Sequence, residues 1–134
     1  MKELKLEART DNISAVTLFA DELLEEAGCP MKTQLQIDVA IDEVMANISN
    51  YAYGGQPGEV TVRMETEDRT AVLTFIDRGM PFNPLDQPPP DVSLPAEKRG
   101  IGGLGIFLVR KTMDEVIYER RGDTNVLTLR KHFA

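Results

Sequence analysis

The sequence has very few of the residues from which metal centres and nucleophilic triads are usually built. Its 134 residues include one cysteine, one histidine and no tryptophan. Disulfide frameworks need pairs of cysteines, and most zinc sites combine several cysteine and histidine ligands. A Ser–His–Asp triad would depend on His132 alone. The composition therefore argues against these three kinds of site, and the lone Cys29 is typical of a cytoplasmic protein in a reducing compartment.

Long apolar runs and excess positive charge are also lacking. No stretch approaches the roughly 20 apolar residues that cross a bilayer, and the first residues alternate charged with apolar side chains, unlike a signal peptide. Fifteen Lys and Arg residues face 22 Asp and Glu residues, a net charge of −7. We therefore expect no membrane contact and no direct nucleic-acid binding. The length predicts a single domain over residues 1–134.

Proline and glycine are concentrated in one segment, Pro81–Gly105. It holds six of the eight prolines, followed by four glycines. Regular helix or strand cannot continue through such a composition. A linker between two domains is one interpretation, but only about thirty residues follow it. Loops of this length inside a small domain are usually functional lids or disordered segments. We therefore expect a lid over about residues 79–105.

Hydrophobic periodicity predicts an alternation of strands and helices on either side of this segment. The expected strands are Lys2–Ala8, Glu59–Glu65, Thr70–Asp77, Glu115–Arg121 and Asn125–Lys131, and the expected helices run from Asp11 or Asn12 to Gly28, from Thr33 to about Tyr51, and from Gly103 to Met113. This order predicts a two-layer α/β (α+β) sandwich, in which a mixed, mostly antiparallel sheet carries helices on one face.

The second expected helix has two separate stripes. Its apolar stripe, which should face the core, consists of Ile37, Ile41, Val44 and Ile48. Glu43, Asn47 and Tyr51 are spaced four apart and form a polar line on another face. This line is either an ordinary solvated face or a functional one. In the functional interpretation, Asn47 offers an oxygen ligand to Mg²⁺ and Glu43 acts on a nucleophile beside the metal.

A second constellation begins where the strand Thr70–Asp77 ends. Asp77 at this exit could accept a hydrogen bond from the amino group of a ligand, and Gly79 would allow a close approach of the backbone. Asp and Gly are also common turn formers. The pair therefore indicates either a ligand acceptor or a plain turn.

A third constellation is a glycine-rich segment that enters the last helix. Its members are Arg99, Gly100, Gly102, Gly103, Leu104 and Gly105. Free backbone N–H groups and the positive end of a helix dipole make such a segment a ready phosphate site. The Walker lysine pattern is lacking, and a flexible loop is an equally good explanation of the glycines alone.

The order and combination of the three constellations is more specific than any one of them. This order resembles the Bergerat ATP-binding fold of histidine-kinase-like ATPases. It runs from Glu43 with Asn47, through Asp77 with Gly79, to the glycine-rich segment. The stretches Asn47–Tyr53, Gly105–Val116 and Asn125–Leu129 resemble the anti-sigma factor serine kinases, a branch of that superfamily. The resemblance extends from about residue 3 to residue 131.

The resemblance implies a role for each matching residue. Glu43 corresponds to the general base toward a substrate serine, and Asn47 to the ligand of a Mg²⁺ ion that bridges the phosphates. Asp77, with Gly79 behind it, corresponds to the acceptor for the adenine amino group. The family also has a threonine near the adenine on the last strands, for which Thr128 and Thr124 are both candidates.

The resemblance likewise implies that the lid closes over the phosphates of ATP. Its glycine-rich end is formed here by Gly100, Gly102, Gly103, Leu104 and Gly105, with Arg99 nearby.

The implied activity is phosphorylation of a serine on an anti-sigma factor antagonist by an ATP-dependent kinase that also acts as an anti-sigma factor. The implied partners are that antagonist, a sigma factor and a second copy of the chain in a homodimer. A non-catalytic ATP-binding switch is the main alternative. A sensor histidine kinase is disfavoured because His132, in a terminal strand, cannot serve as the phosphoacceptor. A generic two-layer α/β domain with structural glycines is the remaining interpretation.

Overall fold

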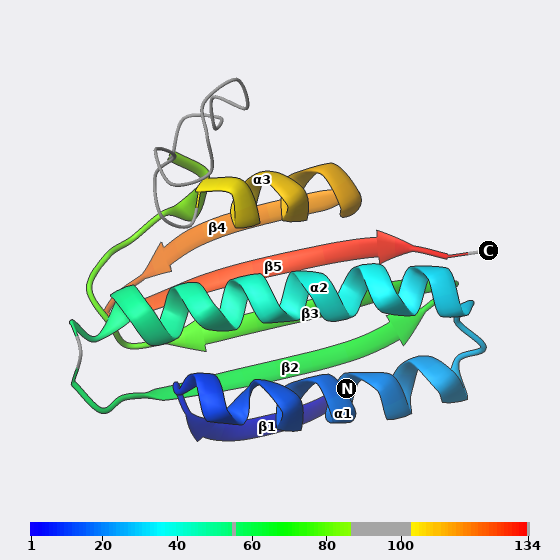
Figure 1. Cartoon of the computed structure of the whole chain (residues 1–134), viewed down its shortest axis with the longest axis horizontal. Coiled ribbons are helices and arrows are strands. Elements are labelled where there is room, and N and C mark those ends of the chain that lie inside the picture. The colour runs from blue at the N-terminus through cyan, green and yellow to red at the C-terminus, as the bar shows by residue number, and fades with distance from the viewer. Residues whose placement is uncertain (55, 87–102, 134) are drawn as a thin grey trace.

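Figure 1 shows the computed structural model, which describes residues 1–54, 56–86 and 103–133. The elements, in chain order, are β1 (Lys2–Glu7), the 3-10 turn η1 (Thr10–Asn12), α1 (Ile13–Glu26), α2 (Met31–Asn47), the π-helical turn η2 (Ile48–Ala52), β2 (Glu59–Glu67), β3 (Thr70–Asp77), the 3-10 turn η3 (Pro84–Asp86), α3 (Gly103–Thr112), β4 (Glu115–Arg121) and β5 (Thr124–His132). Residues 87–102, most of the expected lid, lie outside the described part of the chain.

The five strands form one sheet in the order β1-β2-β3-β5-β4. Every neighbouring pair is antiparallel, so the sheet is purely antiparallel rather than mixed. The three helices lie on one face of it, with α2 in the middle, α1 over the β1 side and α3 over the β4 side (Figure 1). The predicted two-layer sandwich is confirmed. No helix in the described ranges is long and apolar enough to cross a membrane.

Local chemistry explains the turns, and it corrects one predicted helix start. Asp68 and Arg69 both have positive φ, at 50° and 59°, as a two-residue turn that matches the strand twist requires. Asn12 occupies the predicted N-cap position of α1, but its side chain forms no capping hydrogen bond, and its amide donates to the carbonyl of Glu7 at 2.9 Å. Thr33 is not a cap either, since α2 begins two residues earlier, directly after Pro30. Proline suits this position because it lacks an N–H group that would need a partner.

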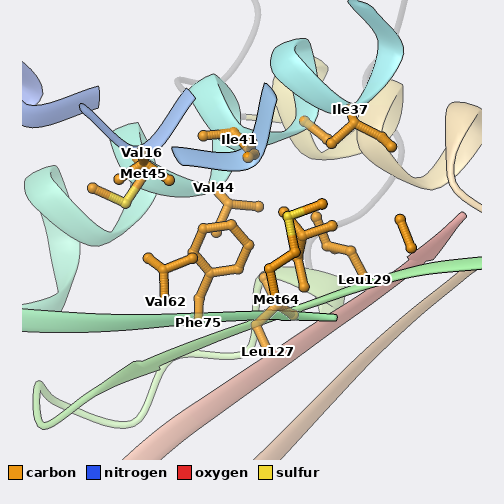
Figure 2. Packing of buried hydrophobic residues seen from close by; sticks show 14 of the residues in the cluster. Val16, Ile37, Ile41, Val44, Met45, Val62, Met64, Phe75, Leu127 and Leu129 are labelled. Atoms are coloured by element: carbon orange, nitrogen blue, oxygen red, sulfur yellow. The ribbon is translucent and has the colours of Figure 1, made fainter. Parts of the chain in front are cut away.

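The core lies between the helices and the covered face of the sheet (Figure 2). On α2 the expected apolar stripe is buried, and Ile37, Ile41 and Val44 are no more than 1% exposed. Strand residues meet this stripe at every second position, as in Leu73 and Phe75 on β3. The same alternation carries Asp77, at the end of β3, onto the covered face. The core packing therefore places this carboxylate beneath the helices.

Candidate functional site

A cavity opens where the C-terminal end of α2 meets the end of β3, the start of β5 and the first turns of α3. Apolar side chains form most of its wall, among them Val44, Ile48, Phe82, Pro84, Ile106 and Leu127. Four polar residues also line it: Asn47, Asp77, Tyr118 and Asn125. Ligand sites commonly combine an apolar wall with a few placed polar groups. The arrangement suits a flat, mainly apolar group that carries a hydrogen-bonding edge.

Asp77 lies at the bottom of this cavity, with only 5% of its surface exposed. One carboxylate oxygen, Oδ1, accepts two hydrogen bonds at 2.9 Å, from the backbone N–H of Gly79 and from the amide of Asn125. No donor among the described residues binds the second oxygen, Oδ2. A buried carboxylate is held by such charge-assisted bonds. Asp77 therefore has one oxygen engaged by the protein and one that remains available as an acceptor.

Asn125 is the residue that sequence reasoning missed. Asn125 pairs directly with Asp77 across β5 and β3, whereas Thr128 pairs with Thr74. Because neighbouring strand residues alternate faces, Thr128 lies on the face of the sheet away from the helices and does not line the cavity. Thr124 closes the β4–β5 turn, where its hydroxyl donates to the carbonyl of Arg121 at 2.7 Å. Only the register of β5 against β3 could have identified Asn125.

Gly79 permits a close backbone contact beside the cavity. A Cβ atom at this position would collide with the backbone carbonyl of Ala52 in the π-helical turn η2. The next residue, Met80, donates its N–H to that same carbonyl at 2.8 Å. At the rim, the ring of Tyr51 stacks on Phe82 with the ring centroids 5.6 Å apart. A side chain at position 79 would therefore separate two segments that line the cavity.

Tyr53 links two backbone segments near the cavity by hydrogen bonds. Its hydroxyl donates to the carbonyl of Glu59 and accepts a hydrogen bond of 2.9 Å from the N–H of Arg78. Burial raises the pKa of this phenol, and the nearby charge of Asp77 adds to the shift. The hydroxyl therefore stays protonated near neutral pH. It ties the start of β2 to the segment that follows Asp77.

Asn47 and Glu43, one turn apart on α2, border different hollows. Asn47 lines the cavity that contains Asp77. Glu43 instead lines a groove between α1 and α2, together with Thr17, Leu18 and other residues of the two helices. The two expected functional side chains thus lie next to each other along α2, but each lines a different hollow.

The start of α3 lies against Glu43. A Cβ atom at Gly105 would overlap the Glu43 carboxylate, so only glycine leaves that carboxylate room here. Gly103 and Leu104 form the beginning of the same helix, where backbone N–H groups lack helical partners. The structure therefore brings Gly105, one of the expected residues of the glycine-rich segment, to the glutamate, and places Gly103 and Leu104 in the turn before it. Arg99, Gly100 and Gly102 lie outside the described residues.

The described residues contain no group of three or more His, Cys, Asp or Glu side chains able to hold a metal ion by themselves. Mg²⁺ commonly takes only one or two protein ligands and completes its shell with water and phosphate oxygens. The amide oxygen of Asn47 fits that requirement. A metal in this cavity would have to arrive with a phosphate-bearing ligand.

Comparison with solved structures supports the fold. The catalytic domain of the histidine kinase ThkA matches 99% of this chain and 98% of its own, with a TM-score of 0.56 and 12% identity. The Acinetobacter baumannii histidine kinase AdeS matches 99% of this chain and 69% of its own, with the same TM-score and 13% identity. At such identities the likeness establishes the architecture alone.

Sequence comparison gives relatives of similar length. The serine-protein kinase RsbW of Listeria monocytogenes serovar 1/2a is 29% identical over 131 residues, which cover 93% of this chain and 83% of the relative. The serine-protein kinase RsbW of Bacillus mycoides is 27% identical over 132 residues, which cover 94% and 82%. A profile described as the histidine kinase-like ATPase domain matches residues 6–131, which include the cavity and α3. The chain therefore belongs to the histidine kinase-like ATPase domain family, and membership in an ATPase family implies that it binds ATP.

Proposed function

We propose that this chain is an ATP-dependent protein serine kinase that also acts as an anti-sigma factor. Its substrate would be a serine on an anti-sigma factor antagonist. One observation carries the proposal: Asn47 lines the cavity of Asp77, whereas Glu43, one turn earlier, lines the neighbouring groove between α1 and α2. Phosphoryl transfer to a second protein needs such a division, because the nucleotide and the acceptor must approach the reacting phosphate from different sides.

In the cavity, we assign the base of ATP to Asp77. Its Oδ2 atom would accept a hydrogen bond from the exocyclic amino group of adenine, while the apolar wall would bury the ring. Gly79 keeps the backbone beside Asp77 close to η2. We assign these residues, together with Asn125, to nucleotide binding, and we withdraw Thr128 because of its position on the other face of the sheet.

We assign the phosphates to the region between Asn47 and the start of α3. Bound ATP supplies the phosphoryl group, and Mg²⁺ held by the Asn47 oxygen would neutralise phosphate charge. The free N–H groups at Gly103, Leu104 and Gly105 suit phosphate oxygens. We assign Arg99, Gly100 and Gly102 to the proposed lid on the sequence prediction alone, because they lie outside the described residues.

Glu43 is the proposed general base. Its carboxylate lies at the start of α3 and opens to a groove outside the nucleotide cavity. There it would accept the hydroxyl proton of an incoming serine and orient that oxygen toward the phosphate. Gly105 leaves the carboxylate room to hold this position. The proposed partners are an antagonist, a sigma factor and a second copy of the chain, in the cytoplasm.

The test separates base from metal ligand. Glu43→Gln should bind Mg-ATP almost normally but transfer phosphate to an antagonist roughly 10²-fold to 10⁴-fold more slowly, with the lower end favoured by a loose transition state. Asn47→Ala should lose Mg²⁺-dependent nucleotide affinity as well as transfer. Nucleotide titration with and without Mg²⁺, combined with single-turnover phosphorylation of co-encoded antagonists, measures both.

Glu22→Gln and Asn50→Ala, at exposed positions outside the cavity and the groove, are the matched controls. Transfer at the wild-type rate by Glu43→Gln would show that the base is another group. If the unmodified chain binds Mg-ATP but phosphorylates no co-encoded antagonist, a non-catalytic ATP-binding switch replaces the kinase.

A further inference from the structure

The Asn125 side chain has all of its hydrogen-bonding capacity engaged by the protein. Its amide nitrogen donates to Asp77 Oδ1 and to the backbone carbonyl of Met80, both at 2.9 Å. Its amide oxygen accepts from the hydroxyl of Tyr118 and, at 3.2 Å, from the guanidinium of Arg120. A primary amide offers two donors and an oxygen with two lone pairs. Asn125 therefore has no hydrogen-bonding group left for a ligand. Its role must be to hold another residue of the site in place.

The groups on both sides of this amide agree on which way it points: the Asp77 carboxylate and the Met80 carbonyl can only accept from its NH₂ group, and two β4 side chains hold its oxygen. If the amide turned over, its NH₂ group would face the Arg120 guanidinium and its oxygen would face the Asp77 carboxylate. A tyrosine hydroxyl can rotate and accept instead of donating, but a guanidinium has no acceptor. Arg120 is therefore the stricter of the two constraints. Tyr118 reinforces this orientation of the Asn125 amide but does not impose it alone.

Arg120 also fixes the turn that follows Asp77. Its Nη1 atom donates to the carbonyl of Gly79 at 2.8 Å, and the Gly79 N–H donates to Asp77 Oδ1. Both hydrogen bonds that engage Oδ1 thus come from groups that Arg120 contacts. With the Asn125 amide and the Gly79 turn held in this way, both donors converge on one oxygen of Asp77. The other oxygen is left as a pure acceptor beside the cavity.

We propose that β4 sets the base specificity of the site. In this scheme Arg120, assisted by Tyr118, holds the Asn125 amide and the Gly79 turn so that Asp77 presents one accepting oxygen to the ligand. Such an acceptor selects a purine with an amino group at position 6 and rejects one with a carbonyl oxygen there. Arg120, Tyr118 and Asn125 are thus positioning residues. The inference rests on the nucleotide-binding part of the proposed function and not on phosphoryl transfer.

The experiment compares ATP with inosine triphosphate, which carries a carbonyl oxygen in place of the amino group. Both affinities are measured on the same preparation, so an unfolded fraction cancels from their ratio. Arg120→Met removes the donors while keeping an extended side chain, and should reduce the preference for ATP about 10-fold. Tyr118→Phe should reduce it less, by about threefold, because Arg120 remains.

Arg120→Lys and Arg121→Met are the controls. A lysine ammonium also donates without accepting, so Arg120→Lys should recover part of the preference that Arg120→Met loses. Arg121 belongs to the same strand but forms an exposed pair with Glu119, at 2.9 Å, and Arg121→Met should leave both affinities unchanged. Recovery by lysine is the result that a role in packing alone would not produce.

Two results would overturn the inference while leaving nucleotide binding intact. In the first, Arg120→Met weakens ATP and inosine triphosphate equally, which would make Arg120 a structural residue only. In the second, both affinities stay at their wild-type values, which would mean that other contacts orient Asn125. An unmodified chain that binds neither nucleotide would contradict the proposed function itself, and the inference with it.

Discussion

Asp77 and Asp38 are both shielded carboxylates, yet their surroundings are opposite. Asp77 faces two donors, the Gly79 N–H and the Asn125 amide. Asp38, on α2, faces Asp21 on α1 and lies near Asp42. Asp21 and Asp38 each have a buried Oδ1 atom without a hydrogen-bond donor among the described residues. The surroundings of Asp77 supply donors to its carboxylate, whereas the surroundings of Asp38 bring several carboxyl groups together.

The pKa of Asp38 expresses this difference. Burial, the contact with Asp21 and repulsion from Asp21 and Asp42 together raise it from 3.8 to about 7. Two carboxyl groups can hydrogen-bond to each other only when one of them carries a proton. The helix pair α1–α2 therefore holds a proton near neutral pH. Burial is the largest cause of the shift at Asp38, and the neighbouring carboxyl groups add to it.

The largest expected effect concerns nucleotide affinity. In Asp77→Asn, the amide oxygen would keep the bonds from Gly79 and Asn125, so an NH₂ group would take the place of Oδ2. That donor would face the adenine amino group, and affinity for ATP should fall about 100-fold, the scale of a lost hydrogen bond to a charged group. Titration with a fluorescent ATP analogue measures it.

Asp38→Asn is the matched control for this prediction, because it changes the other shielded carboxylate and should leave nucleotide affinity at the wild-type value. Unchanged affinity in Asp77→Asn would show that the base is held elsewhere. A loss in Asp38→Asn would show that the two sites are not independent.

A smaller effect is expected on stability. Because the folded-state pKa of Asp38 is raised, the folded chain binds this proton more tightly than the unfolded chain, and the resulting stability is lost as the pH rises from about 4 to about 7. Asp38→Asn should remove part of this decline and raise the free energy of unfolding at pH 8 by about 1 kcal/mol, a value discounted for partial solvent screening.

Urea unfolding at several pH values measures this effect. A wild-type free energy of unfolding that stays constant from pH 5 to pH 8 would contradict the shared proton between α1 and α2. Asp123→Asn, in the exposed β4–β5 turn, should behave as the wild type and serves as the control.

The smallest expected effect links Cys29 to the same pair. Burial raises the pKa of this thiol, and the charge of Asp38 raises it further. Cys29 should therefore react slowly with iodoacetamide at pH 8, and Asp38→Asn should increase the rate by no more than about twofold. The time course of alkylation followed by mass spectrometry provides the measurement. A decrease in rate would contradict the assigned sign of the interaction between Asp38 and Cys29.

Local pattern was enough to predict most of the elements and one line of candidate residues. The strand Thr70–Asp77 was predicted with its observed ends, because alternation and the following Arg-Gly mark both boundaries. The spacing of Glu43 and Asn47 placed them on one side of α2, as helical periodicity requires. The start of α2 was predicted two residues late, because Thr33 looks like a cap while Pro30 begins the helix without one.

The sequence by itself determined the sandwich, the polar line on α2 and the acid at the end of β3, since each depends on residues near one another in the chain. Only the tertiary structure decided that Asn125 and not Thr128 contacts Asp77, that Arg120 holds the Gly79 turn, and that Asp21 meets Asp38. These contacts join residues from different elements. Their geometry depends on strand register and helix packing, and one step in register would move each strand side chain to the other face of the sheet.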